Sequence, residues 1–193
     1  MKFYSTRDTE YAHGCSLREA AMMGLAPDGG LFVPERIPQA DMAEVERLAA
    51  ESYPALAGYL AGLFFGDDFD SQVMQRELDG LYDFPVPLRV VGRGRYTLEL
   101  FHGPTCAFKD FGAGFMGRMI GLLGAADEKL VILTATSGDT GSAVAHGFYN
   151  VPGVEVVVLY PEGKISRLQE CQMTALGGNI HPLRVAGTFD DCQ

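Results

Sequence analysis

Three short apolar runs in the second half of the chain place the strongest limit on its fold. They lie at residues 129–134, 155–160 and 180–185, and the segments between them, 140–149 and 166–176, have helical periodicity. A strand–helix–strand–helix–strand order predicts parallel βαβ units with right-handed crossovers. The sequence therefore predicts an α/β fold for this half, with a parallel sheet of about three strands, fewer than the mean sheet has.

The first part of the chain has a different pattern, dominated by helices. Pro85 and Pro87 mark a linker after the last of them. We therefore expect a mostly helical domain over residues 1–84 and an α/β domain over residues 85–193. The candidate helices of the first domain are 17–25, 41–52, 54–65 and 71–82.

Charge and cysteine usage exclude several classes of function. The formal net charge of −10 argues against binding to nucleic acid or to anionic membranes, and no apolar run approaches membrane-spanning length. The four cysteines contain no C-x-x-C pair, and the chain starts without an apolar signal sequence. The four histidines lack the spacing of metal ligands. We expect a cytoplasmic protein with free thiols and no metal site.

One lysine stands in an unusual position. Residues 101–112 read FHGPTCAFKDFG, so Lys109 lies between a proline-containing turn and the start of a helix of small residues. The N-terminus of a helix carries a partial positive charge and therefore disfavours an ammonium group. A neutral amine is the form that makes a Schiff base with a carbonyl cofactor. The alternative is an ordinary surface lysine at a helix start.

A second unusual segment is the loop TSGDTGS at residues 136–142, which follows a predicted buried strand and opens a helix. Gly138 and Gly141 expose backbone N–H groups, and the hydroxyl side chains add donors suited to a carboxylate or phosphate. Asp139 opposes an anion unless it is protonated or faces another group. The alternative is a turn in which Ser and Thr only cap the helix.

Residues 112–117 match the pattern G-x-G-x-x-G, which also occurs in dinucleotide-binding folds. The match follows a proline-containing loop where that fold would have a strand, and the next predicted strand has no acidic residue at its end. We interpret these glycines as a site of close helix packing.

Taken together, these segments resemble the threonine synthase family of pyridoxal phosphate (PLP) enzymes, which have the tryptophan synthase β-like fold, or fold type II. The resemblance extends over nearly the whole chain, including MKFYSTR at 1–7 and GLAPDGGLFVP at 24–34. Residues 101–110 resemble the segment that carries PLP. Residues 136–143 resemble the loop that faces the cofactor ring and the substrate carboxylate.

The resemblance implies a reaction and a set of site residues. O-phospho-L-homoserine and water would give L-threonine and phosphate, with PLP as the electron sink. Lys109 would carry the cofactor and transfer protons, and Asp139 and Gly138 would lie beside it. The residues expected at the substrate are Thr136, Ser137, Thr140 and Gly141. A related PLP-dependent phospho-lyase and a non-catalytic scaffold or dimerisation unit remain the alternatives.

The resemblance covers only part of a longer family sequence. The glycine-rich loop for the PLP phosphate and the partner of the pyridine nitrogen would lie beyond the segments matched here. Residues 188–193 read as a helix cap and one helical turn, which is unstable alone. We therefore expect a truncated, inactive piece of the enzyme, and a homo-oligomer is left open.

Overall fold

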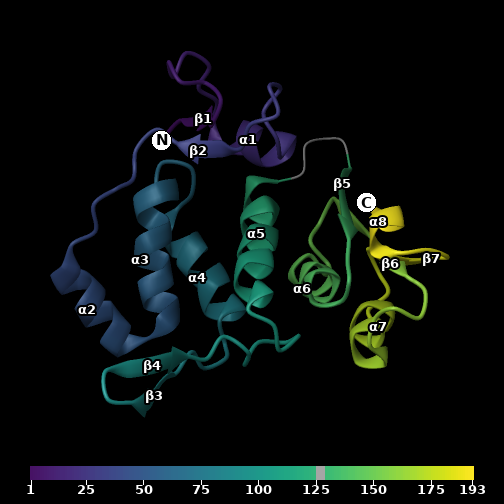
Figure 1. The fold of residues 1–193 in the computed structure, drawn as a ribbon. Helices are drawn as coiled ribbons and strands as arrows, with labels where there is room; N and C mark the ends of the chain where they lie inside the picture. Colours follow the sequence, from purple (N-terminus) through teal and green to yellow (C-terminus); the bar gives the residue numbers. More distant parts are fainter. Residues whose placement is uncertain (125–128) are drawn as a thin grey trace. The chain divides into compact units, whose positions relative to one another are not determined.

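The computed structural model describes residues 1–124 and 129–193 (Figure 1). Within this range the chain divides into two compact units, Met1–Gly80 and Leu81–Gln193. The first is mostly helical, and the second combines helices with strands. The two units are described separately below.

The first unit contains the four helices expected from the sequence, each within two residues of its expected ends. Its two short strands pair antiparallel, with Phe3 opposite Pro34. The sequence indicated a short apolar run for the second strand but gave no sign of the first, because three residues carry no readable alternation. The elements are β1 (Phe3–Ser5), α1 (Leu17–Met23), β2 (Phe32–Pro34), α2 (Met42–Glu51), α3 (Tyr53–Phe65) and α4 (Ser71–Leu81).

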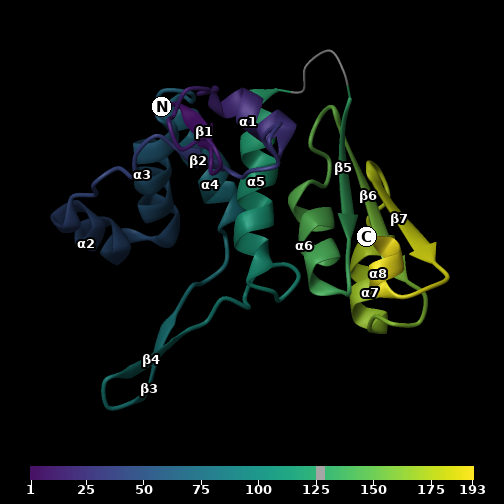
Figure 2. The same cartoon turned by 45° about the horizontal axis from the view of Figure 1, so that its top comes forward.

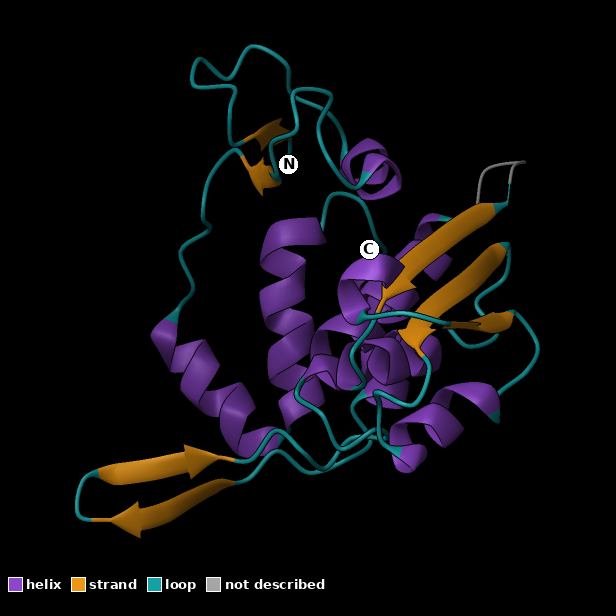
Figure 3. Ribbon diagram, turned by 45° about the vertical axis from the view of Figure 1, so that its right-hand side comes forward, coloured by secondary structure: helices purple, strands orange, loops and turns teal. Residues whose placement is uncertain are grey.

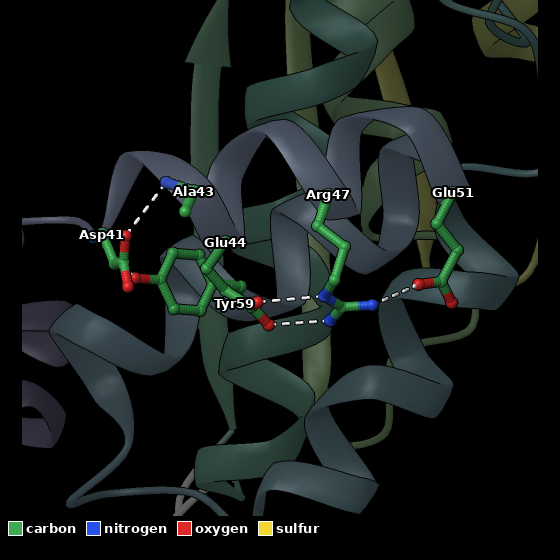
Figure 4. Close-up of polar contacts among 6 residues, drawn as sticks. All are labelled: Asp41, Ala43, Glu44, Arg47, Glu51 and Tyr59. Carbon is green, nitrogen blue, oxygen red and sulfur yellow. Dashed lines mark hydrogen bonds and ion pairs between the residues drawn. The ribbon is translucent and has the colours of Figure 1, made fainter.

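Polar contacts fix the start of α2 and join it to α3 (Figure 4). The Asp41 carboxylate accepts a hydrogen bond from the backbone N–H two residues later, and the Tyr59 hydroxyl accepts from the Asp41 N–H at 2.9 Å. Farther along the helix, Arg47 pairs with Glu44 at 2.7 Å and with Glu51 at 3.2 Å. These ion pairs are exposed and lie within α2, so they add little to stability and do not join α2 to the rest of its unit.

The second unit begins with a hairpin that the sequence did not predict. The alternation of apolar and polar residues over 96–101 indicates the second strand, whereas nothing in the sequence pattern indicated the first, which follows the linker marked by Pro85 and Pro87. Figure 3 shows the two strands joined by a short loop. The elements are β3 (Leu88–Gly92), β4 (Arg95–Leu98), α5 (Lys109–Leu123), β5 (Leu130–Ala135), α6 (Asp139–Gly147), β6 (Val154–Pro161), α7 (Arg167–Thr174), β7 (Ile180–Val185) and α8 (Phe189–Cys192).

A parallel sheet in the order β5-β6-β7 forms the centre of this unit, which confirms the predicted βαβ units (Figure 2). Alternate residues of β6, from Val154 to Tyr160, are buried against Ala145 of α6 and Met173 of α7. On the opposite face, Val131 and Leu133 are 57% and 69% exposed. The helices therefore cover one face of the sheet more completely than the other.

Helices α5 and α6 approach closely at glycine. A Cβ atom on Gly117 would collide with the carbonyl oxygen of Gly147, and one on Gly147 would collide with the carbonyl group of Ala113. This confirms the interpretation of the G-x-G-x-x-G match as a site of close helix packing. The contact fixes the position of α5, whose first residue is Lys109, relative to α6, whose first residue is Asp139.

Two properties of the described residues bear on function. No helix among them is long and apolar enough to cross a membrane. Within the same ranges, no cluster of three or more His, Cys, Asp or Glu side chains could hold a metal ion.

Candidate functional site

Lys109 and Asp139 meet where two helices begin. The Lys109 Nζ atom donates a hydrogen bond to Asp139 Oδ2 at 2.8 Å, across thirty positions of sequence. It also lies 4.9 Å from the centroid of the Phe108 ring. The Lys109 side chain is 32% exposed and that of Asp139 44% exposed. The amine is thus accessible, and its direction is set by a specific partner.

This pairing answers the question that the sequence left open about Asp139. The carboxylate faces another charged group, and the hydrogen bond from Lys109 holds the pKa of Asp139 below its ordinary value. It is therefore ionised at neutral pH. The positive end of α5 and the Asp139 carboxylate, which lies within ion-pair distance, therefore act on the Lys109 amine with opposite signs.

The loop between β5 and α6 is held from within by Thr136. Its Oγ1 atom accepts hydrogen bonds from the backbone N–H groups of Gly138 and Gly141, both at 2.9 Å, and the residue is only 1% exposed. Ser142 Oγ donates to the Gly138 carbonyl at 3.2 Å. Both glycine N–H groups that the sequence suggested for an anion are therefore used inside the loop.

The residues expected at the site divide by burial. Ser137 is exposed and Thr140 is half-buried, so both reach the surface beside Asp139. Thr136, Gly138 and Gly141 are buried. A Cβ atom on Gly138 would meet Gln169 of α7, and one on Gly141 would meet the side chains of Thr136, Val158 and Met173. The two glycines thus let the loop pack closely against the sheet and α7.

Sequence reasoning missed Asp110, the residue after Lys109. Its side chain is buried, with 4% exposure, and accepts hydrogen bonds from the backbone N–H of Thr105 at 3.0 Å and from the Thr105 hydroxyl. Gln172 of α7 donates to the Thr105 carbonyl at 3.3 Å. An acidic residue in the first turn of a helix was the available signal, but it is also common on exposed helix ends.

Comparison with known proteins gives the same picture for both units. Residues 2–82 match the family model described as "Threonine synthase N terminus". Threonine synthase from Escherichia coli is 42% identical over 193 residues, which are 100% of this chain and 44% of that protein. The Schizosaccharomyces pombe enzyme is 37% identical over 92% of this chain and 38% of its own length.

Solved structures agree in fold. The E. coli threonine synthase structure superposes with a TM-score of 0.85 at 41% identity and covers 100% of this chain and 44% of that one. A PLP-bound threonine synthase from Brucella melitensis gives 0.91 at 35% identity and covers 100% of this chain and 42% of that one.

A helical unit followed by parallel βαβ units, with a lysine at the start of the first helix of the second unit, defines an α/β protein of fold type II. Within that class the chain is similar to the N-terminal portion of the threonine synthases, along its whole length. It spans 44% of the length of the E. coli protein and 42% of that of the B. melitensis protein.

Proposed function

We propose that this chain supplies the N-terminal portion of a PLP-dependent threonine synthase, a carbon–oxygen lyase that converts O-phospho-L-homoserine and water to L-threonine and phosphate. Residues 1–84 would form the N-terminal domain and residues 85–193 the first part of the catalytic domain. Similarity along the whole chain supports this proposal. The observation that carries it is the accessible Lys109 amine, held against Asp139 at the start of two helices.

The residues at this site fit a flat carbonyl cofactor. The Lys109 side chain, whose amine would bind the aldehyde, is 32% exposed, and the neighbouring loop contributes two glycines. When bound, PLP supplies an electron sink for the substrate's α-carbon. Among the described residues, Gly138 and Gly141 already donate to Thr136, so their N–H groups do not provide a phosphate cradle.

In this proposal the chain's own residues bind the substrate and move protons. Lys109 would hold the cofactor, and its amine would take and return protons at the substrate's α- and β-carbons. Asp139 is ionised beside Lys109 Nζ and stabilises the protonated amine between transfers.

The substrate carboxylate would bind at the loop 136–141. Ser137 and Thr140 reach the surface there and can donate from their hydroxyls, and the positive end of α6 favours an anion. Each charge-assisted hydrogen bond is worth about 1.5–3 kcal/mol. Thr136 and Gly141 would contribute by fixing the shape of the loop through the hydrogen bond between them.

The proposal includes a small anionic substrate and a location in the cytoplasm. The four cysteines are free, with Cys106 and Cys171 exposed, which suits a reducing compartment. The net charge of −10 disfavours nucleic acid as a partner. No contact observed here defines an oligomer.

The test is covalent trapping of PLP. The protein that the whole gene encodes is incubated with PLP, reduced with borohydride and digested, and the modified peptide is identified by mass spectrometry. We expect the cofactor on Lys109, and we expect Lys109→Ala to abolish phosphate release from O-phosphohomoserine, because both the attachment point and the proton carrier are lost.

Other outcomes would contradict the proposal in distinct ways. Modification of Lys129 or Lys164 in place of Lys109 would show that the site is misassigned. Phosphate release from a different phosphorylated amino acid alone would indicate a related phospho-lyase. Failure to trap PLP anywhere would favour a non-catalytic scaffold.

A further inference from the structure

We infer that Asp110 is a positioning residue, which sets the direction of the Lys109 side chain by locking the turn that precedes α5. The inference rests on the proposed function in taking Lys109 as the reactive amine. Its basis is the set of contacts around the Asp110 carboxylate, which lies in the second unit with all of its partners.

The turn before α5 cannot hold its shape through local preferences alone. Cys106 has a φ of +58°, in the left-handed region that non-glycine residues rarely adopt. Its N–H donates to the Gly103 carbonyl at 3.1 Å, which closes the turn. Such a conformation persists only where its surroundings impose it.

Asp110 provides that constraint. Its carboxylate accepts two hydrogen bonds from Thr105, one from the backbone N–H and one from the hydroxyl. A Cβ atom on Gly103 would lie 2.6 Å from Asp110 Oδ2, so the carboxylate packs directly against the start of the turn. The positive end of α5 favours a negative charge at this position. The Gln172 side chain also donates a hydrogen bond to the Thr105 carbonyl.

The constraint reaches Lys109 because the two residues are neighbours in the first turn of α5. Adjacent helical residues are separated by about 100° around the axis, since the helix has about 3.6 residues per turn. When the Asp110 side chain is fixed inward, the direction in which the Lys109 side chain leaves the helix is fixed as well. That direction brings Lys109 Nζ to Asp139 Oδ2.

The experiment measures the reactivity of the Lys109 amine in the 193-residue protein without cofactor. Trace acetylation followed by mass spectrometry gives the labelling rate of each lysine. We expect Asp139→Asn to raise Lys109 labelling by about two- to fivefold, the range for loss of a partly exposed ion pair. When Asp110→Ala or Thr105→Val is already present, Asp139→Asn should raise Lys109 labelling by less than about 1.5-fold. The reason is that the first substitution has already loosened the Lys109–Asp139 pair.

Conservative variants separate positioning from a structural role. Thr105→Ser keeps the hydroxyl, and Asp110→Asn keeps an acceptor for the Thr105 N–H, so both should retain the full response to Asp139→Asn. Lys129, which pairs with Glu155 at 2.9 Å, is the internal control, and its labelling should not change in any of these variants. Circular dichroism verifies that each variant is folded.

Two results would overturn the inference. One is a folded Asp110→Ala or Thr105→Val protein in which Asp139→Asn raises Lys109 labelling as much as in the parent. The other is unfolding of Thr105→Val, which loses a single hydroxyl, because the contact would then support the fold and not the direction of Lys109.

A second arm keeps this inference separate from the proposed function. PLP and borohydride are added to the same variants made in the protein that the whole gene encodes. Loss of the labelling response with no PLP trapped on any lysine would support the positioning role and contradict the cofactor assignment. If PLP is trapped on Lys109 as in the parent and the labelling response is unchanged, the cofactor assignment is supported and the positioning role is contradicted.

Discussion

At the scale of single residues, the site depends on groups that satisfy each other before any ligand binds. Lys109 and Asp139 form an ion pair, and the Thr136 hydroxyl accepts hydrogen bonds from two N–H groups of its own loop. The hydroxyls that reach the surface, on Ser137 and Thr140, are therefore the ones available to a substrate.

Thr136→Val should destabilise the protein, whereas Thr136→Ser should not. Valine has nearly the same shape but leaves the Gly138 and Gly141 N–H groups without their buried acceptor. Each unsatisfied group costs about 1–3 kcal/mol. Urea unfolding followed by circular dichroism measures the difference. Equal stability of the two variants would show that water replaces the hydroxyl.

The Lys109–Asp139 pair should make stability depend on pH in acid. Because the folded-state pKa of Asp139 is lowered, its contribution is present above the unfolded-state pKa and is lost as pH falls through the folded value. The side chain is 44% exposed, so the contribution should stay below about 1 kcal/mol. Urea unfolding between pH 7 and pH 3 should show a smaller loss for Asp139→Asn than for the parent. An identical loss would mean that the pair does not contribute.

At the scale of elements, the approach of α5 to α6 places the two charged residues together. This approach requires glycine at specific positions, because the backbone of one helix lies where a side chain of the other would be. The capping boxes that begin α1 and α8 act locally, and each is complete in the structure. Helix positions thus follow from local signals, whereas helix contacts follow from small residues at matched positions.

Gly117→Ala and Gly112→Ala should change stability in opposite directions. Both lie in α5, but a Cβ atom on Gly117 would collide with the Gly147 carbonyl oxygen, whereas one on Gly112 would have nothing within 4 Å. Overpacking costs about 1–3 kcal/mol, and replacing glycine by alanine within a helix gains about 0.5–1 kcal/mol. Thermal unfolding of the two variants provides the comparison. Stabilisation by both would show that α5 and α6 can separate without cost.

At the scale of the whole molecule, the second unit leaves apolar surface uncovered on its sheet. Val131, Leu133 and Leu183 are each at least half exposed, and parallel sheets are normally covered on both faces. The strands β5 and β7 also have unpaired outer edges among the described residues. Such surfaces favour association.

The 193-residue protein should therefore associate as its concentration rises, and Leu133→Lys should weaken this association. Sedimentation velocity over a range of concentrations measures the effect. Leu31→Lys is a matched control, because Leu31 is 61% exposed and lies in the other unit. An equal effect of both substitutions would attribute the change to net charge and not to the sheet face.

The sequence by itself determined the elements and the chemistry to look for. The predicted helices and the three parallel strands are all present, because caps, prolines and apolar periodicity act over a few residues. The motif around Lys109 also predicts a reactive amine. Both kinds of signal are local, so they can be read without knowing what packs against them.

Only the tertiary structure decided which side chains meet. It brought Asp139 to Lys109, turned Thr136 inward and buried Asp110 under the turn at Thr105. These contacts have no signature in the sequence, because each depends on how the surrounding segments pack, and the sequences of those segments allow several arrangements. The β3–β4 hairpin is different, because its two strands are neighbours in sequence and are joined by a short loop. A carboxylate in a first helical turn can face solvent or be buried, and the neighbouring segments determine which.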